Sequence, residues 1–277
     1  NDRIGAREFG DYTSPEKKIG AFDVFHPWET CETLTYGAAE RPADFRNKVK
    51  YPGFWQAEKM DKMVRSLQPD IITNDRIGAR EFGDYTSPEK KIGAFDVFHP
   101  WETCETLTYG AWGYCPGSRV RSLRECISLL VNVVVAGGNL LLNVGPRGDG
   151  SIEPLQIKRL KEIGNWLKKY GESIYKTRGG PIKCDVWGGT VHRDNVMYVH
   201  VCNWENDEIA IPDTGNPQIE CLTATPKIRK VDGKILLSVD DNAKQAPDTI
   251  FKLTYGQNVD EIFKSCIDYS SKSSYTE

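Results

Sequence analysis

Residues 137–150 read GGNLLLNVGPRGDG, and this stretch decides the fold. The run from Asn139 to Val144 is apolar at its centre, which is typical of a strand buried on both faces in a parallel sheet. The glycines at 137 and 138 predict the end of a preceding helix. The loop at 145–150 lacks the Gly-Lys-Ser/Thr of a phosphate loop, so nucleotide binding is excluded there.

Helical patterns flank this strand on both sides. Apolar residues recur at helical spacing from Ser118 to Ala136, and a further helix is predicted to begin at Pro154 and to end at Gly171. Upstream, residues 55–67 predict an amphipathic helix and Asp70–Thr73 a short buried strand. Residues 53–175 therefore alternate helix and strand, which predicts an α/β fold with parallel strands.

The pattern changes after about Thr177. Short apolar segments separated by turn signals such as Arg193–Asn195 and Asp232–Gly233 predict an antiparallel all-β domain, a β-sandwich. The tail from Ser265 is polar and is expected to be loose.

Composition limits the range of functions. The chain has 277 residues, 39% of them hydrophobic, which suffices for one large domain or for one domain with a smaller one. A net charge of −3 with scattered basic residues gives no sign of a nucleic-acid partner. The chain opens on Asn-Asp-Arg-Ile, and its longest apolar run is short, so neither a secretory leader nor a membrane span is expected. The eight cysteines lack zinc-site spacing and do not decide the redox compartment.

Residues 1–38 and 74–111 are identical. Structural repeats diverge and come in three or more copies, so a perfect pair indicates a recent duplication or, as we favour, a join in gene prediction or assembly. The second copy follows a helix and a strand pattern, whereas the first runs into Ala39 without such neighbours. We therefore assign function to the second copy and expect Arg3 and Glu16 to be non-functional duplicates of Arg76 and Glu89.

The segment 84–89, DYTSPE, is predicted to be a loop after the strand that ends near Asn74. Loops that follow barrel strands form the active face, and Arg76 at the strand end can donate several hydrogen bonds to sugar hydroxyls. The alternative is structural: a surface ion pair for Arg76, and a helix start at Glu89 after Pro88. Likewise, residues 99–102 with Trp112–Tyr114 form either an aromatic wall or part of the core.

Six motifs in order (NDRIG, GDYTSPE, PWETC, WGY, GGNLLLNVGPRGDG and IGNWLKKYGESIYKTR) resemble the α-L-fucosidases of glycoside hydrolase family 29 over roughly residues 50–260. The resemblance implies the C-terminal half of a (β/α)8 barrel followed by a β-sandwich. The expected divisions are 1–38, a duplicated segment; 39–178, the incomplete barrel; 179–264, the sandwich; and 265–277, the tail.

The resemblance also implies an activity, the hydrolysis of terminal α-L-fucose from fucosylated oligosaccharides or glycoconjugates with retention, through two carboxylates. It maps the acid/base onto Glu89 and fucose binding onto Arg76, with Trp112 as a further substrate-binding residue. No metal or cofactor is implied, nor a nucleic-acid or membrane partner. Family members are commonly secreted, periplasmic or lysosomal.

One part of the family pattern is absent. The nucleophilic Asp of the family ends an apolar strand just upstream of the helix at Trp55, and no such strand is found here. Asp44 is roughly in range, but residues 40–44 lack a barrel-strand pattern. A half barrel exposes strand edges, so we expect self-association and little or no activity of the isolated chain. The alternative is a non-catalytic carbohydrate-binding protein derived from a fucosidase.

Overall fold

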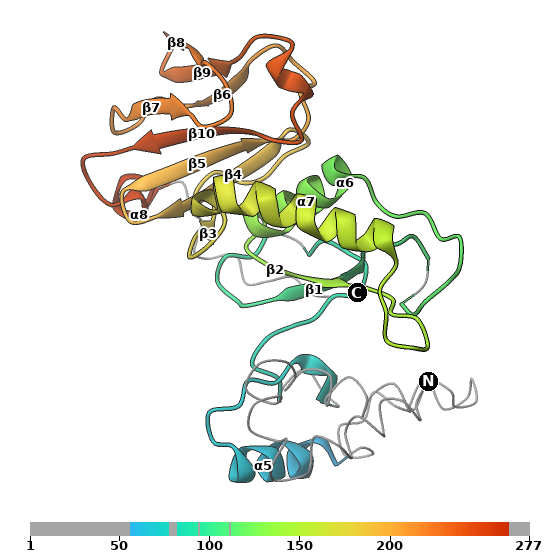
Figure 1. Ribbon diagram of the computed structural model, residues 1–277. Coiled ribbons are helices and arrows are strands. Elements are labelled where there is room, and N and C mark those ends of the chain that lie inside the picture. The colour runs from blue at the N-terminus through green and yellow to red at the C-terminus, as the bar shows by residue number, and fades with distance from the viewer. Residues whose placement is uncertain (1–55, 78–81, 94, 111, 266–277) are drawn as a thin grey trace. The chain divides into compact units, whose positions relative to one another are not determined.

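A computed structural model of the chain describes residues 56–77, 82–93, 95–110 and 112–265. It comprises two compact units, one ending at Ser87 and the other beginning at Pro88 (Figure 1). The first repeat copy, Asp44 and all but the first residue of the predicted tail lie outside the described residues. The expected division at 178 falls within the second unit.

The first unit contains helix α5 (Ala57–Leu67) and the 3-10 helix η1 (Asp75–Ile77). The predicted helix is confirmed, although Leu67 on its apolar side is exposed. The strand predicted at 70–73 is wrong, because this segment has only a single parallel bridge, from Asn74 to Tyr85. A strand requires a ladder of backbone partners, and here the backbone N–H of Thr73 donates to a carboxylate oxygen of Asp84 instead, at 2.8 Å.

The second unit begins with a strand–helix–strand arrangement. Strand β1 (Glu102–Thr106) pairs in parallel with β2 (Asn139–Asn143), and helix α6 (Leu123–Val135) connects them. The predicted strand at 139 is confirmed as β2, but the expected burial on both faces is wrong, because Leu141 is 40% exposed. Strand β1 was not predicted, because its sequence ETCET has no apolar run; its buried positions are largely threonines. The (β/α)8 barrel itself stays a prediction.

Helix α6 starts at Leu123, five residues later than the pattern predicts, because Ser122 forms its N-cap. The Ser122 hydroxyl accepts from the backbone N–H of Glu125, and the Glu125 carboxylate accepts from the backbone N–H of Ser122 at 2.6 Å. This reciprocal pair is a capping box. The predicted helix from Pro154 is confirmed as α7 (Pro154–Tyr170), followed at Gly171 by the 3-10 helix η2 (Gly171–Ser173). None of the described helices could cross a membrane.

The predicted antiparallel strands are confirmed. They form a five-stranded sheet in the order β3-β4-β5-β10-β7 and a three-stranded sheet in the order β6-β9-β8 (Figure 1). Their bounds are β3 (Arg178–Gly179), β4 (Gly188–Arg193), β5 (Val196–Val201), β6 (Ile209–Pro212), β7 (Gln218–Cys221), β8 (Lys227–Val231), β9 (Lys234–Ser238) and β10 (Thr249–Thr254). The 3-10 helix η3 (Ala243–Gln245) lies between β9 and β10, and helix α8 (Val259–Ile262) follows β10.

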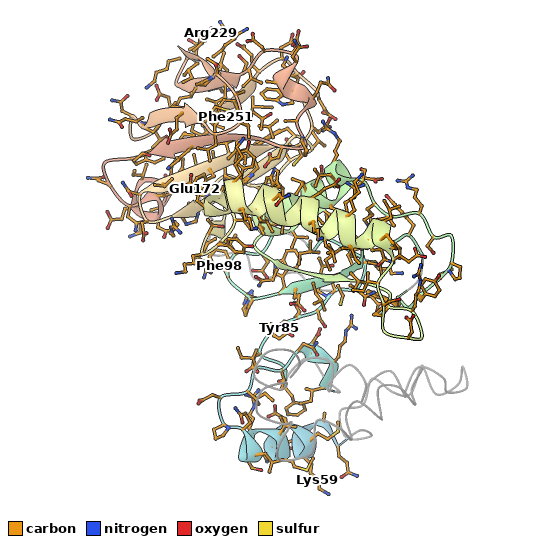
Figure 2. All side chains as sticks on the ribbon, viewed as in Figure 1. Lys59, Tyr85, Phe98, Glu172, Arg229 and Phe251 are labelled. Atoms are coloured by element: carbon orange, nitrogen blue, oxygen red, sulfur yellow. The ribbon has the colours of Figure 1, made fainter. Side chains whose placement is uncertain are left out.

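The five-stranded sheet has two buried faces. Side chains alternate between the two faces of a strand. On one face of the sheet, a single core contains Met197 and Val199 of β5, Phe251 of β10 and residues of β6 and β9. Figure 2 labels Phe251. On the opposite face, Tyr198 of β5 packs against Ile127 of α6 in a second core. The sheet thus joins the three-stranded sheet to the helices, and the unit is continuous across the expected division at 178.

A fully buried histidine–aspartate pair lies on the helix side of this sheet. The His200 Nδ1 is 2.6 Å from an oxygen of Asp248, and its Nε2 donates to the carbonyl of Ser173 in η2 at 3.1 Å. Both side chains are 0% exposed. Burial, followed by the nearby Asp248 charge, raises the pKa of the neighbouring Cys202 thiol. The imidazole therefore links β5 to η2 through Ser173, and to the segment that precedes β10 through Asp248, by two buried hydrogen bonds.

We predict that Asp248→Ala lowers the free energy of unfolding by about 3 kcal/mol, because it leaves the buried imidazole Nδ1 without its hydrogen-bond partner. The matched control is Asp260→Ala, which removes the acid beside the other buried histidine, His192; the Asp260 side chain is 54% exposed. An exposed partner contributes about 1 kcal/mol or less. Urea unfolding followed by circular dichroism measures both. Equal losses in the two variants would contradict the assignment.

A second prediction concerns the capping box. The backbone N–H of Ser122, then the hydroxyl of Tyr109, lower the pKa of Glu125 to about 2. A carboxylate whose pKa is depressed by folding stabilises the folded state above its unfolded pKa of about 4.3, and this stabilisation is lost as the pH falls towards 2. Glu125→Gln should therefore be less stable than wild type at pH 7 and equal to it near pH 2, measured by urea unfolding. A difference in unfolding free energy between Glu125→Gln and wild type that stays constant from pH 7 to pH 2 would contradict the prediction.

Candidate active site

The backbone around Glu89 is held against strand β1. Glu89 forms a parallel bridge with Cys104, and the N–H of Lys90 donates to the Cys104 carbonyl at 3.0 Å. The buried Thr103 hydroxyl contacts the carbonyl of Lys91 at 2.7 Å. This segment is extended alongside β1, so the alternative of a helix start at Glu89 is wrong. The side chain of Glu89 lies on the surface.

Trp112 contacts the Glu89 carboxylate. Its indole N–H donates to Oε1 of Glu89 at 3.1 Å, and the ammonium of Lys90 lies 4.9 Å from the centre of the indole ring. The ring is half-buried. A cation over an aromatic face is attracted by the negative π cloud, so Lys90 occupies part of the surface on which a sugar would stack. The clearest contribution of Trp112 to the site is therefore the indole N–H at the edge of its ring.

The loop that carries Trp112 is fixed at its base. Thr108 and Val120 form an antiparallel bridge, and the N–H of Tyr109 donates to the carbonyl of Arg119 at 2.9 Å. The guanidinium carbons of Arg119 and Arg121 lie 4.4 and 4.5 Å from the centre of the Tyr109 ring. Because the Tyr109 hydroxyl also donates to Glu125 at 2.7 Å, the start of α6 anchors this loop.

The expected aromatic wall does not include Trp101. This residue is 1% exposed and packs with Val133 and Ala136 beneath β2, so the core alternative is correct for it. Tyr114, by contrast, is 37% exposed, and its hydroxyl donates to Glu153 at 3.2 Å. Trp112 and Tyr114 are therefore the members of the predicted set that reach the surface near Glu89.

Arg76 belongs to the first unit. It lies in η1 and is half-buried, and its guanidinium donates to the carbonyl of Ser87 at 3.2 Å. The neighbouring Asp75 accepts from the hydroxyl and the backbone N–H of Ser87 at 2.7 and 3.0 Å. The predicted strand end is thus a 3-10 turn that is held to the end of the DYTSPE loop.

Asp84, the first residue of that loop, has a structural role that sequence reasoning missed. Burial tends to raise the pKa of its carboxyl, but the backbone N–H of Thr73 and the guanidinium of Arg65 outweigh this and lower the pKa. Arg65 lies 3.0 Å from Asp84. The acid therefore ties α5 and the segment at Thr73 to the loop, whereas the last residue of the motif, Glu89, carries the candidate chemistry.

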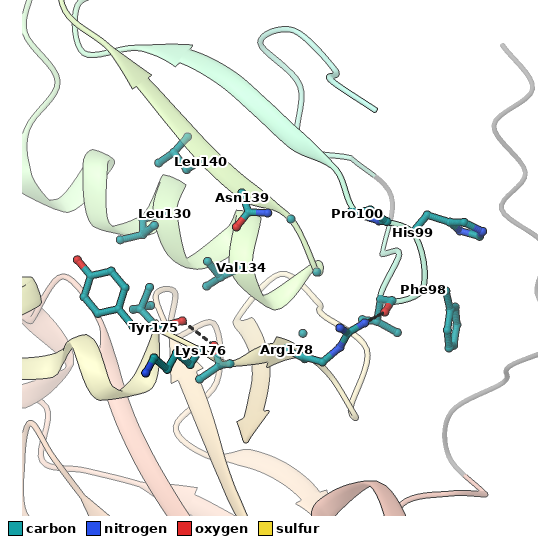
Figure 3. A pocket seen from close by; sticks show the side chains of 16 residues that line it. Phe98, His99, Pro100, Leu130, Val134, Asn139, Leu140, Tyr175, Lys176 and Arg178 are labelled. Atoms are coloured by element: carbon teal, nitrogen blue, oxygen red, sulfur yellow. Dashed lines mark hydrogen bonds between the residues drawn. The ribbon is translucent and has the colours of Figure 1, made fainter. Parts of the chain in front are cut away.

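A cavity of about 570 Å3 lies at the other end of the β1–β2 ladder (Figure 3). Its lining includes His99 and Pro100, which precede β1, and Asn139, which begins β2. Arg178 crosses its rim and donates to the carbonyl of Val97 at 2.6 Å. Since Trp112 contacts the opposite end of β2, this cavity is distinct from the surface around Glu89.

Comparisons with known proteins bear on the family and the fold of the chain. A family described as Alpha-L-fucosidase matches residues 42–172. A plasma α-L-fucosidase from Pongo abelii is 33% identical over 150 residues, which is 50% of this chain and 32% of the relative. A tissue α-L-fucosidase from Rattus norvegicus is 30% identical over 219 residues, 75% of this chain and 45% of the relative.

Among solved structures, α-L-fucosidase isoenzyme 1 from Paenibacillus thiaminolyticus superposes with a TM-score of 0.64 at 27% identity, over 72% of this chain and 53% of that one. The chain therefore spans less than half the length of these two curated relatives. Sequence and fold together show that the chain belongs to the α-L-fucosidase family and spans part of the length of the family's members.

Proposed function

We propose that this chain is the part of a retaining exo-glycosidase that carries its acid/base residue, Glu89, and that the enzyme releases terminal α-L-fucose from fucosylated glycans. The observation that supports this most directly is the contact between the Glu89 carboxylate and the Trp112 indole N–H at 3.1 Å, in a chain of the α-L-fucosidase family. The Glu89 side chain is exposed, so its carboxylate is accessible to both a glycosidic oxygen and water.

The donor fixes the geometry of proton transfer. An indole N–H donates and never accepts, so Oε1 of Glu89 is the acceptor in this contact whether or not the carboxyl group carries a proton. When that proton passes to the leaving oxygen, Glu89 becomes an anion and the indole contact becomes a stronger, charge-assisted hydrogen bond. Trp112 therefore stabilises the charge that develops on Glu89 during bond cleavage.

In the second half of the reaction Glu89 acts as a base. Its ionised carboxylate removes a proton from the water that attacks the glycosyl-enzyme ester, which restores the acid. The second carboxylate of the pair is not assigned to any described residue. Two carboxylates are sufficient for this chemistry, so the proposal includes no metal or cofactor.

Arg76 is proposed to bind the sugar. A guanidinium presents five N–H donors in a fixed plane, and one of its terminal nitrogens donates to the Ser87 carbonyl at 3.2 Å. That contact orients the plane, and a planar guanidinium suits the hydroxyls of a fucose ring. Arg76 would then contribute to substrate affinity and Glu89 to turnover.

A second candidate function is a carbohydrate-binding protein without catalysis. It is favoured by the absence of an apolar strand ending in Asp before Trp55. Fucose binding by the purified chain, without release of nitrophenol from an aryl α-L-fucoside, would support it. Turnover that depends on Glu89 would exclude it.

We predict that Glu89→Gln lowers kcat on a fucosylated oligosaccharide by about 100-fold or more, because the glutamine cannot donate a proton to the sugar leaving group. The fucosyl-transfer step should suffer less with nitrophenyl α-L-fucoside, whose leaving group departs without protonation. Release of fucose and of nitrophenol measures the two rates.

Glu16→Gln is the matched control, because Glu16 lies in the identical sequence 73 positions earlier. At the position that corresponds to Trp112 the first copy has Ala39, which provides no indole donor. Glu16→Gln should therefore retain wild-type rates. Equal losses in the two variants, or none in Glu89→Gln, would contradict the role given to Glu89.

Arg76→Lys should raise KM for the fucoside by about ten-fold with a smaller change in kcat, because lysine replaces a planar fork of donors with a single ammonium. Arg3→Lys in the first copy is the control and should leave KM unchanged. The measurement is the initial rate against fucoside concentration. A loss confined to kcat would show that Arg76 does not act through substrate affinity.

A further inference from the structure

The backbone of Trp112 is held by the end of strand β2. The side-chain amide of Asn143 donates to the Trp112 carbonyl at 2.7 Å. Trp112 in turn donates from its indole to Glu89, and the segment at Glu89 is bridged to Cys104 of β1. Since β1 and β2 are paired, these contacts form a closed circuit in which each strand holds one member of the Trp112–Glu89 pair.

Asn143 is itself rigidly placed. It pairs with Thr106 in the last position of the ladder, and its carbonyl accepts from the N–H of Leu107 at 2.8 Å. Its amide therefore projects from a fixed point on the sheet. The hydrogen bond to Trp112 is short, so Asn143 fixes both the distance and the direction of that peptide group.

Gly145 limits the next peptide of the loop, between Gly113 and Tyr114. A Cβ at Gly145 would lie 2.8 Å from the Gly113 carbonyl oxygen, so the chain at 145 and the loop at 113 are in direct backbone contact. The flexible side chain of Lys90 also contacts Trp112, at the face of the indole ring, and it donates to the Gly110 carbonyl at 3.3 Å. Of these contacts, Asn143 provides the rigid polar one.

We propose that Asn143 is a positioning residue for the acid/base carboxylate: by holding the Trp112 carbonyl, it directs the indole N–H onto Oε1 of Glu89. The assignment rests on the proposed function of Glu89, but the geometric claim is testable without turnover. The peptide held by Asn143 and the indole belong to the same residue, so releasing the carbonyl allows the loop to shift and the ring to turn away.

The experiment compares two asparagines of the same strand. Asn143→Ala removes the donor to Trp112, and Asn139→Ala removes the amide at the opposite end of β2, which faces the carbonyl of Trp101 at a weaker 3.5 Å. Protein labelled with 15N at the indole nitrogens is titrated with acid and followed by NMR. The chain has seven tryptophans, and the indole signal of Trp112 is identified because it is lost in Trp112→Phe.

In wild type and in Asn139→Ala, the Trp112 indole signal should move with pH, and this movement should vanish in Glu89→Gln. In Asn143→Ala the signal should lose most of the movement. Asn143→Leu has a similar size, with neither a donor nor a titrating group, and should behave likewise, so a folding defect in the alanine variant does not prevent the test. An Asn143 variant that titrates like wild type would overturn the proposal, as would a wild-type signal that is indifferent to Glu89→Gln.

A kinetic comparison separates this proposal from the function of Glu89. Asn143→Ala should lower kcat on a fucosylated oligosaccharide about ten-fold, with little change in KM and a smaller loss on the nitrophenyl fucoside, because proton donation is impaired rather than sugar binding. A loss in KM alone would overturn the positioning role. Absence of turnover in wild type is what the missing nucleophile strand predicts for the isolated chain, and the NMR comparison then decides the role of Asn143 by itself.

Discussion

The second unit depends on the burial of helix α6 on two sides. Ile127 and Val131 are 0% exposed and face the five-stranded sheet, whereas Val133 packs on Trp101 beneath the β1–β2 ladder. A helix that is apolar around most of its circumference has to be covered on more than one side. This requirement holds the parallel ladder and the antiparallel sheets in one body, and it brings the start of α6 under the loop that carries Trp112.

The sequence allowed the regular elements to be predicted wherever one local signal dominated. Strand β2, helix α7 and the antiparallel strands were predicted from apolar runs, Pro154, Gly171 and turn residues, and all are present. Strand β1 was missed because two of its buried side chains are threonines, which hydrogen-bond to the carbonyls of other segments, Thr103 to Pro88 and Lys91 and Thr106 to Thr108, and form no apolar pattern. The strand at 70–73 failed for the opposite reason: its residues are apolar, but its backbone partner is a carboxylate.

The candidate site was predictable only in part. Glu89 and Trp112 were assigned through the family resemblance, and the structure brings them into contact. Tyr109, Asn143 and Gly145 gave no separate signal, because their partners are backbone groups or residues distant in sequence. Context also distinguishes the two identical segments. Thr30 and Cys31 repeat Thr103 and Cys104, whereas the first copy has an alanine where the second meets a tryptophan.

Strand β5 separates an apolar environment from an ionic one. Met197, Val199 and Val201 point to one side, and Tyr198 and His200 to the other. A slip of one residue against β4 or β10 would insert the imidazole among aliphatic side chains and leave Asp248 opposite a valine. Register errors in this strand therefore carry the full cost of a misplaced charge. The antiparallel sheets and the helical layer consequently have to find their alignment together, as one cooperative folding step.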